Sequence, residues 1–361
     1  MWTRGESSCL GFRLHEVGRV TASHPAVVAD AEDYAEDHQP TIMHAMLRYA
    51  SRAVVGVGAS TLATTAFADG KEPPLSYRPP FVAPQSTNAA WVQSMKEGKA
   101  MMGCAVNSSS SLVTEICAAT GFDFLLIDAQ HSAVNPETLR HLLQACHAGG
   151  AKAFVRVGGH NDRVGIQQAC DLGADGVLVP CVRTKADVEL AVSCCKYPMS
   201  GRGAVGGTRS VFVNLRPQLP GGFGKLFDYV HNGNPTVVVA VQIETKDALE
   251  NVEEICSVDG LDIAFIGPGD LAVDMGLGRE CGVPACWGDP RFGAAVGKVA
   301  AACKASGVIG GFWNSGLEGT IPQGFRFFVV DDDVCAMQET LAKNLVGFQE
   351  KRQTALAGLA K

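Results

Sequence analysis

From residue 88 onward, short apolar runs alternate with stretches whose apolar residues recur at helical spacing. The apolar runs predict eight buried strands, over residues 100–106, 122–128, 153–157, 176–180, 236–242, 261–266, 308–313 and 325–330. Helical stretches separate most of them, at residues 136–147, 162–171, 184–195, 246–256 and 290–306, and a further helix over 89–99 precedes the first strand.

This alternation defines an α/β fold. Strands that are apolar throughout, each followed by a helix, are typical of parallel strands covered on their outer face. The pattern therefore predicts a (β/α)8 TIM barrel. An open doubly wound sheet is the alternative, and eight units without an evident reversal of strand order favour the closed form.

The sequence divides into three parts. Residues 1–87 form an N-terminal extension and linker with an acidic run and five closely spaced prolines, residues 88–345 form the barrel, and residues 346–361 form a C-terminal tail. The long Gly- and Pro-rich segment 199–233 inside the barrel domain is expected to form a lid or a subunit contact over the mouth.

Part of the extension is similar to a targeting peptide. The segment from Met46 to Ala68 carries Arg48 and Arg52, no acidic residue, and a small apolar run. We expect a cytoplasmic protein, or a mitochondrial one if translation starts at Met43 or Met46 and this segment is a targeting signal. The apolar run is too short to span a bilayer, so no membrane partner is expected.

Charge and cysteine content narrow the class of protein further. The net charge is −7 and no dense basic patch occurs, which argues against a nucleic-acid partner. The 13 cysteines include no Cys-x-x-Cys pair, and most lie within apolar patterns. We interpret them as small core residues in a reducing compartment.

Polar side chains follow four of the predicted strands, at the end where each strand finishes. Asp128 and His131 follow the second strand, Arg156 ends the third, Glu244 follows the fifth, and Asp270 follows the sixth. The carboxyl ends of barrel strands meet at one mouth, so these side chains are expected to lie together. Taken singly, a histidine in a loop, an arginine paired with an acid, or a glutamate capping a helix would have no catalytic meaning.

The residue types at this mouth favour metal chemistry. Glu244 and Asp270, with no cysteine or second histidine nearby, form a hard-oxygen site that suits Mg²⁺ or Mn²⁺. Arg156 offers a planar fork for a carboxylate, and His131 is a proton carrier near neutral pH. Asp171 either accepts the second ring hydrogen of His131 or satisfies amides at the end of its own helix.

Two other motifs carry little weight. Residues 201–206 match G-x-G-x-x-G but do not follow a strand, so a dinucleotide site is not expected. A Schiff-base mechanism needs a lysine at a strand's carboxyl end, whereas Lys152 lies at the start of its strand and Lys246 falls in the next helix.

Residues 121–131, 155–156, 173–180, 242–245 and 265–270 together resemble the HpcH/HpaI (4-hydroxy-2-oxoheptanedioate) aldolase family, over about residues 88–338. The resemblance implies a class II, metal-dependent, pyruvate-forming aldolase on a (β/α)8 barrel, commonly a homohexamer that exchanges a C-terminal helix. It also implies a divalent cation, Mg²⁺ or Mn²⁺ with Co²⁺ or Zn²⁺ possible.

The resemblance also assigns roles. It implies Glu244 and Asp270 as metal ligands, His131 as the base, Asp171 as the residue that tunes it, and Arg156 as the group that stabilises developing charge. Substrate binding is assigned to a set that adds Gln242 and the Gly269 backbone to Arg156 and Asp270. Two departures stand out: Gln130 where the family usually has Glu, and Asp331-Asp332-Asp333 where a glycine is usual.

We therefore expect reversible cleavage of a 4-hydroxy-2-oxo acid, of the 2-keto-3-deoxy acid type, to pyruvate and an aldehyde. The partners would be these small molecules and other copies of the chain. One alternative is an acyl-CoA lyase of the citrate lyase beta-like branch, which would need a basic groove that the sequence does not obviously supply. The other is a catalytically inactive binding or scaffold barrel, suggested by Gln130 and Asp331.

Overall fold

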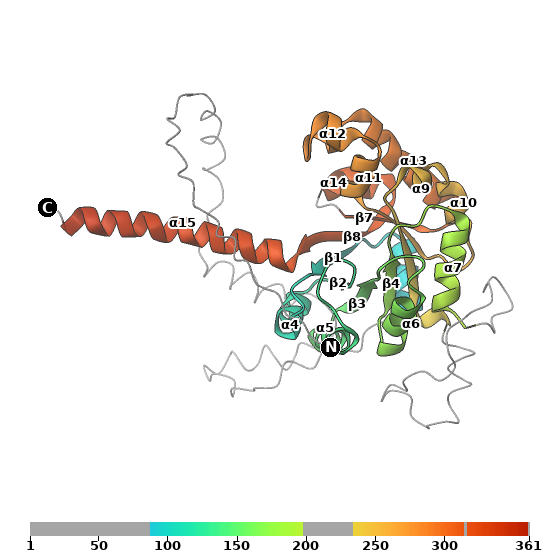
Figure 1. The fold of residues 1–361 in the computed structure, drawn as a ribbon, viewed down its shortest axis with the longest axis horizontal. Helices are drawn as coiled ribbons and strands as arrows, with labels where there is room; N and C mark the ends of the chain where they lie inside the picture. The colour runs from blue at the N-terminus through green and yellow to red at the C-terminus, as the bar shows by residue number, and fades with distance from the viewer. Residues whose placement is uncertain (1–86, 198–233, 314–315, 360–361) are drawn as a thin grey trace, which may run out of the picture. The chain divides into compact units, whose positions relative to one another are not determined.

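The computed structural model describes residues 87–197, 234–313 and 316–359. Eight parallel strands follow one another in sequence order around a closed barrel, and β8 pairs with β1 (Figure 1). The strands are β1 (Met101–Val106), β2 (Phe124–Asp128), β3 (Lys152–Arg156), β4 (Gly176–Val179), β5 (Val238–Ile243), β6 (Ile263–Ile266), β7 (Ile309–Trp313) and β8 (Phe325–Asp332). The prediction of a TIM barrel is confirmed, and the open sheet is wrong.

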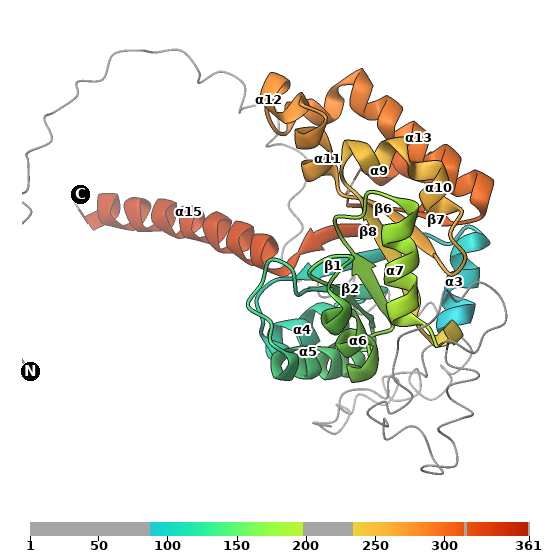
Figure 2. The same ribbon diagram turned by 45° about the vertical axis from the view of Figure 1, so that its right-hand side comes forward.

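Helices cover the outside of this barrel, except α15, which projects away from it (Figures 1 and 2). They are α3 (Asn88–Lys96), α4 (Ser111–Ala119), α5 (Pro136–Gly149), α6 (Arg163–Leu172), α7 (Lys185–Cys195), α9 (Lys246–Glu250), α10 (Val252–Cys256), α11 (Pro268–Asp274), α12 (Leu277–Cys281), α13 (Pro290–Ser306), α14 (Leu317–Thr320) and α15 (Asp333–Leu359). Short 3₁₀ turns are η2 (Asn234–Thr236), η3 (Ala285–Gly288) and η4 (Ile321–Gln323). None of the helices in these described ranges is both long and apolar enough to cross a membrane.

The expected helix over 246–256 is two helices, because the chain leaves helical geometry at Asn251. Its ψ is 10°, and its side chain donates to the Arg183 carbonyl rather than capping α10. The opening of α5 follows the sequence: Asn135 accepts from the Thr138 amide at 2.8 Å, and Pro136 occupies the first turn. The C-terminal division expected at residue 346 lies inside the continuous helix α15.

Aromatic rings fill the inside of the barrel. Phe124 stacks on Phe327 with ring centroids 4.1 Å apart, and Trp91 from α3 packs on Phe154 at 5.6 Å. A Cβ at Gly103 would lie 2.3 Å from the Phe124 ring, so only glycine leaves room for that ring in the barrel. Of the 12 cysteines that the structure describes, eight are buried, as expected of core residues, and Cys117 is half-buried. Cys181, Cys281 and Cys335 are exposed, so for these three the expectation is wrong.

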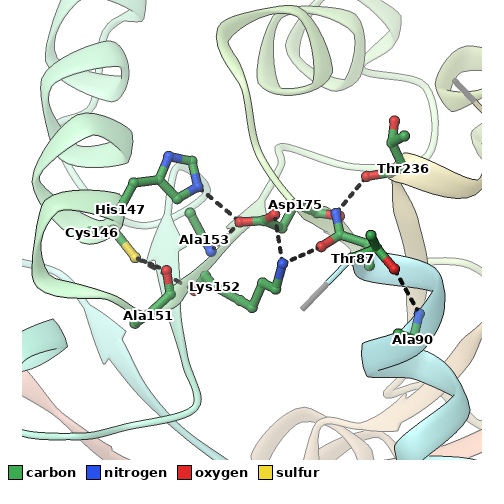
Figure 3. A network of polar contacts seen from close by, with 10 residues as sticks. Thr87, Ala90, Cys146, His147, Ala151, Lys152, Ala153, Asp175 and Thr236 are labelled. Carbon is green, nitrogen blue, oxygen red and sulfur yellow. Dashed lines mark hydrogen bonds and ion pairs between the residues drawn. The ribbon is translucent and has the colours of Figure 1, made fainter. Parts of the chain in front are cut away.

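A charged network fixes α3 to the amino ends of the strands (Figure 3). Asp175, just before β4, accepts hydrogen bonds from His147 at 2.8 Å and from the Ala153 amide at 2.9 Å, and it pairs with Lys152 at 3.4 Å. Lys152 also donates to Asn88 of α3 at 2.6 Å. Burial alone would raise the pKa of Asp175, but the His147 hydrogen bond and the charges of His147 and Lys152 lower it to about 2.

The Asp175 network makes a testable contribution to stability. We expect Asp175→Asn to lower the free energy of unfolding by about 2 to 3 kcal/mol at pH 7, because it leaves Lys152 buried without its countercharge. A depressed folded-state pKa stabilises the fold above the ordinary value of 3.8, and this is lost as the pH falls through about 2. The difference in the free energy of unfolding between Asp175→Asn and wild type, measured with urea, should therefore become smaller below pH 4.

The matched control is Glu253→Gln, which removes an exposed ion pair with Lys298. This variant should lower the free energy of unfolding by less than about 0.5 kcal/mol. An equal loss of stability in Asp175→Asn and Glu253→Gln would contradict the stabilising role of the Asp175 network.

Candidate functional site

Arg156 and Asp128 form a two-pronged polar contact at the carboxyl ends of β3 and β2. Arg156 Nε and Nη2 donate to the two carboxylate oxygens of Asp128 at 3.0 and 2.6 Å, and both side chains are buried. The Arg156 guanidinium also lies over the ring of Trp313 at the end of β7, 5.3 Å from the ring centroid. This two-pronged contact fixes the plane of the guanidinium.

The Asp128 carboxyl has a pKa below its ordinary value. Burial would raise the pKa of the Asp128 carboxyl, but hydrogen bonds from Arg156 and from the amides of Gln130 and His131 lower it overall. Asp128 therefore stays ionised and keeps its hold on Arg156.

Glu244 follows β5 and is buried, with 5% of its surface exposed. Its Oε1 accepts from the Cys181 amide at 2.6 Å, and its Oε2 accepts from Gln242 Nε2 at 2.5 Å. Burial and the negative charge of Asp270 raise the pKa of the Glu244 carboxyl, and the Cys181 hydrogen bonds and the charge of Arg156 oppose that rise. The protein thus fixes both oxygens of Glu244 by hydrogen bonds but compensates its negative charge only in part.

Asp270 lies in the first turn of α11 with its side chain exposed, and Gly269 beside it is also exposed. A Cβ on Gly267 would lie 3.0 Å from Glu244 Oε2, so the start of this turn passes directly by Glu244. Glu244 and Asp270 are therefore brought to one place from two strands. Within the described residues no three His, Cys, Asp or Glu side chains gather as a ligand set.

The donor chemistry of this site fits a hard divalent cation. Two carboxylates, one of them buried with a raised pKa, supply oxygen ligands and an excess of negative charge. The buried amide oxygen Gln242 Oε1 has no hydrogen-bond partner among the described residues. Such an atom is costly to leave unpaired, and a ligand group beside Glu244 would satisfy it.

Cys181 is a residue of the mouth that the sequence analysis did not identify. It follows β4 with φ of 59°, its amide holds Glu244, and its thiol lies 3.9 Å from Gln130 Nε2. Burial, then the charge and hydrogen bond of Glu244, raise the pKa of the thiol. Its position one residue after Pro180, at a predicted strand end, was the signal available in the sequence.

The remaining predicted residues separate into two groups. His131 is exposed beside β2, and its amide donates to Asp128 Oδ1 at 3.3 Å, so it lies at the mouth. Asp171 lies near the end of α6, four residues before Asp175, which holds the amino end of β3. Helices in this fold run back toward the amino ends of the strands, so Asp171 and His131 of one chain lie at opposite ends of the barrel.

Some expectations fall outside the described residues. These are the N-terminal extension with its targeting-like segment, the 199–233 lid and the 201–206 glycine motif. The two departures from the family pattern are described: Gln130 lies beside Cys181, and Asp333 accepts from the amides of Asn107 and Ser108 at 2.8 and 3.1 Å.

Together the fold and the mouth define a class of protein, a (β/α)8 barrel with a buried polar site at the carboxyl ends of its strands. The family model described as HpcH/HpaI aldolase/citrate lyase matches residues 101–326, more than half of the chain. The chain therefore belongs to the HpcH/HpaI aldolase/citrate lyase family, and the resemblance inferred from its motifs is confirmed.

Individual relatives agree with this assignment. A 4-hydroxy-2-oxo-heptane-1,7-dioate aldolase of Klebsiella pneumoniae is 39% identical over 193 residues, covering 53% of this chain and 69% of that protein. One of Salmonella arizonae is 34% identical over 220 residues, covering 61% and 80%. The crystal structure of a family protein from Burkholderia cenocepacia J2315 has a TM-score of 0.63 at 25% identity, covering 72% of this chain and 99% of that one.

The contact between Glu244 and Cys181 predicts a change in thiol reactivity. Glu244→Gln removes the charge that raises the pKa of the Cys181 thiol, so more thiolate is present at pH 8. We expect iodoacetamide to alkylate Cys181 roughly threefold faster or more, measured on the Cys181 peptide by mass spectrometry.

Cys335 is an internal control, because its exposed thiol is influenced by Asp332 rather than by Glu244. Its rate should not change. Acceleration of both thiols by the same factor would indicate general loosening of the chain and contradict the specific contact.

Proposed function

We propose that this chain is a divalent-metal-dependent, class II aldolase that reversibly cleaves a 4-hydroxy-2-oxo acid to pyruvate and an aldehyde. The observation that carries the proposal is the buried carboxylate of Glu244, held at both oxygens beside Asp270 and Arg156. Family membership supports carbon–carbon bond cleavage. The Klebsiella and Salmonella relatives are named for a heptane-1,7-dioate, which is one acid of this class.

Arg156 binds the anionic end of the substrate in this proposal. Its Nε and Nη2 already serve Asp128, and no hydrogen bond to the described residues uses Nη1. Nη1 is therefore the donor directed at a substrate oxygen, with the plane of the guanidinium fixed in advance. The amide oxygen of Gln242 supplies an acceptor on the other side of Glu244.

His131 transfers the proton. It removes the proton of the C4 hydroxyl, the C3–C4 bond breaks, and the bonding electrons pass to the enolate of pyruvate while the aldehyde leaves. Protonation of C3 then completes pyruvate. The exposed ring of His131 exchanges its proton with water between turnovers.

Glu244 and Asp270 are the residues that would hold the cation. Mg²⁺ and Mn²⁺ prefer such oxygen ligands, and Co²⁺ or Zn²⁺ also accept them. A divalent cation in this position polarises a keto oxygen and stabilises negative charge that develops there. The chain's own contribution is to keep Glu244 ionised, through the Cys181 hydrogen bonds and the charge of Arg156.

We also propose that the chain assembles as a homo-oligomer, with a hexamer as the family expectation. Apart from Asp333 at its start, α15 buries no residue, and it continues away from the end of β8 (Figure 2). One face of this helix carries a set of exposed apolar residues at helical spacing: Val334, Met337, Leu341, Leu345, Phe348 and Leu356. A stripe of this length is stabilised by packing on another copy of the chain.

The metal requirement is tested by pyruvate release from a 4-hydroxy-2-oxo acid. We expect EDTA to lower turnover by about 100-fold or more and Mg²⁺ or Mn²⁺ to restore it. Glu244→Gln should lose both turnover and Mn²⁺ binding, the latter measured by electron paramagnetic resonance. Glu253→Gln is the surface control. Full turnover in EDTA would contradict the metal role, and Mn²⁺ binding without any turnover would favour the inactive scaffold.

The pH dependence of Mn²⁺ binding has a definite sign. A proton competes with the cation for Glu244, and the raised pKa means that protonation begins at a pH above the ordinary value of 4.5. Affinity should therefore fall on acidification before ordinary glutamates titrate.

The assembly is tested by a charge on the apolar face of α15. Leu341→Glu should convert the oligomer into smaller species by light scattering, because the variant places a carboxylate in an apolar contact. Thr354→Glu adds the same charge on the opposite face of the helix and should leave the mass unchanged. An identical mass for wild type and Leu341→Glu would contradict the role of this face.

A further inference from the structure

The turn after β4 has an unfavourable main-chain conformation. Cys181 adopts φ of 59°, in the left-handed region that residues other than glycine rarely occupy. Such a residue persists only where its surroundings hold it in place. The Cys181 amide donates to Glu244 Oε1 at 2.6 Å, so this turn is what holds one oxygen of the buried carboxylate. The contacts that keep the turn in shape therefore also keep Glu244 in place.

His160 contacts the other side of this turn. It lies in the connection between β3 and α6, and its Nδ1 is 3.2 Å from the Cys181 carbonyl oxygen. A carbonyl oxygen can only accept, so Nδ1 carries the hydrogen and donates it. The main chain of Cys181 is thus held in two directions, because its amide donates to Glu244 and its carbonyl accepts from His160.

Asp187 orients the His160 ring from the opposite edge. Its Oδ1 lies 3.6 Å from His160 Nε2. Asp187 is itself fixed in the first turn of α7, where its Oδ2 accepts from the amides of Arg183 and Thr184 at 2.8 and 2.9 Å. Its own amide donates to the Thr184 hydroxyl, which completes a capping box. The ring of His160 therefore lies between a fixed carboxylate and the Cys181 carbonyl.

We propose that His160 is a positioning residue for Glu244, and that it acts through the Cys181 turn without contacting the substrate. The Nδ1 hydrogen bond keeps Cys181 in the conformation in which its amide meets the carboxylate. Without this bond the two peptide planes beside Cys181 relax, and the amide turns away from Glu244. The consequence for turnover rests on the proposed aldolase function, in which Glu244 holds the cation.

The first experiment measures amide hydrogen exchange at Cys181 in three variants of His160, by mass spectrometry with residue-level fragmentation. The amide nitrogen of asparagine takes about the place of Nδ1, whereas that of glutamine takes about the place of Nε2. His160→Ala and His160→Gln should therefore speed exchange of the Cys181 amide by about 3-fold or more, since each loses the donor. His160→Asn should exchange at about the wild-type rate.

The second experiment measures Mn²⁺ binding by electron paramagnetic resonance and pyruvate release on the same variants. Kd for Mn²⁺ should rise by about 3-fold or more in His160→Ala and His160→Gln, with a parallel fall in kcat/KM, and His160→Asn should stay near wild type. His141→Ala is the matched control, because His141 is an exposed histidine on α5. A role in stability alone would not separate asparagine from glutamine in this way.

The outcomes separate this inference from the function on which it rests. If the Cys181 amide exchanges at the wild-type rate in His160→Ala, or if His160→Asn and His160→Gln behave alike, the positioning role is overturned, and pyruvate release by the wild type still supports the aldolase. If exchange follows the expected order but the wild type neither binds Mn²⁺ nor releases pyruvate, the positioning of Glu244 is supported and the aldolase proposal fails.

Discussion

The pairing of β1 with β8 is the interaction on which the rest of this structure depends. Met101 to Ala105 are aligned with Phe327 to Asp332, and this last parallel pair leaves no open strand edge among the eight strands. Closure has a chemical consequence as well as a structural one. It turns the carboxyl ends of β2, β3, β5 and β6 toward one mouth. Asp128, Arg156, Glu244 and the turn before Asp270 therefore come together, although more than 140 residues separate Asp128 from Asp270 in the sequence. The register between β1 and β8 shifts at Gly103, so that Cys104 is aligned with Asp331 and Ala105 with Asp332.

Two carboxylates at the mouth, Asp128 and Glu244, differ in how far the protein compensates their negative charge. Asp128 receives two hydrogen bonds from Arg156 and is a permanent anion whose task is to orient that guanidinium. Glu244 receives one amide and one side-chain hydrogen bond, lies near a second acid, and has its pKa raised. The protein compensates the charge of Asp128 more fully than that of Glu244. This difference supports the proposal that Asp128 has a structural role and Glu244 a binding role.

The sequence was sufficient for the strands, for the family and for most of the residues at the mouth, since buried parallel strands are apolar throughout and their ends are marked by isolated polar residues. It was insufficient where the outcome depended on tertiary contacts. The Arg156 and Asp128 pairing requires register between β2 and β3, and the place of Cys181 requires the turn after β4. The link between Asp171, near the end of α6, and His131, after β2, rests on the family resemblance and stays a prediction. The break at Asn251 and the Asp175 network also depend on distant partners.

Residue 181 contacts Glu244 through its thiol and also through its main-chain amide, and the amide contact has a consequence for variation at the mouth. The side chain at this position can be exchanged without removing the donor that keeps the carboxylate in place. Its left-handed backbone, with φ of 59°, sets the one restriction, since asparagine and glycine adopt that geometry more readily than β-branched residues. Evolution and protein engineering thus have a position where the surface beside Glu244 can be redesigned while the main-chain hydrogen bond to the acid is kept.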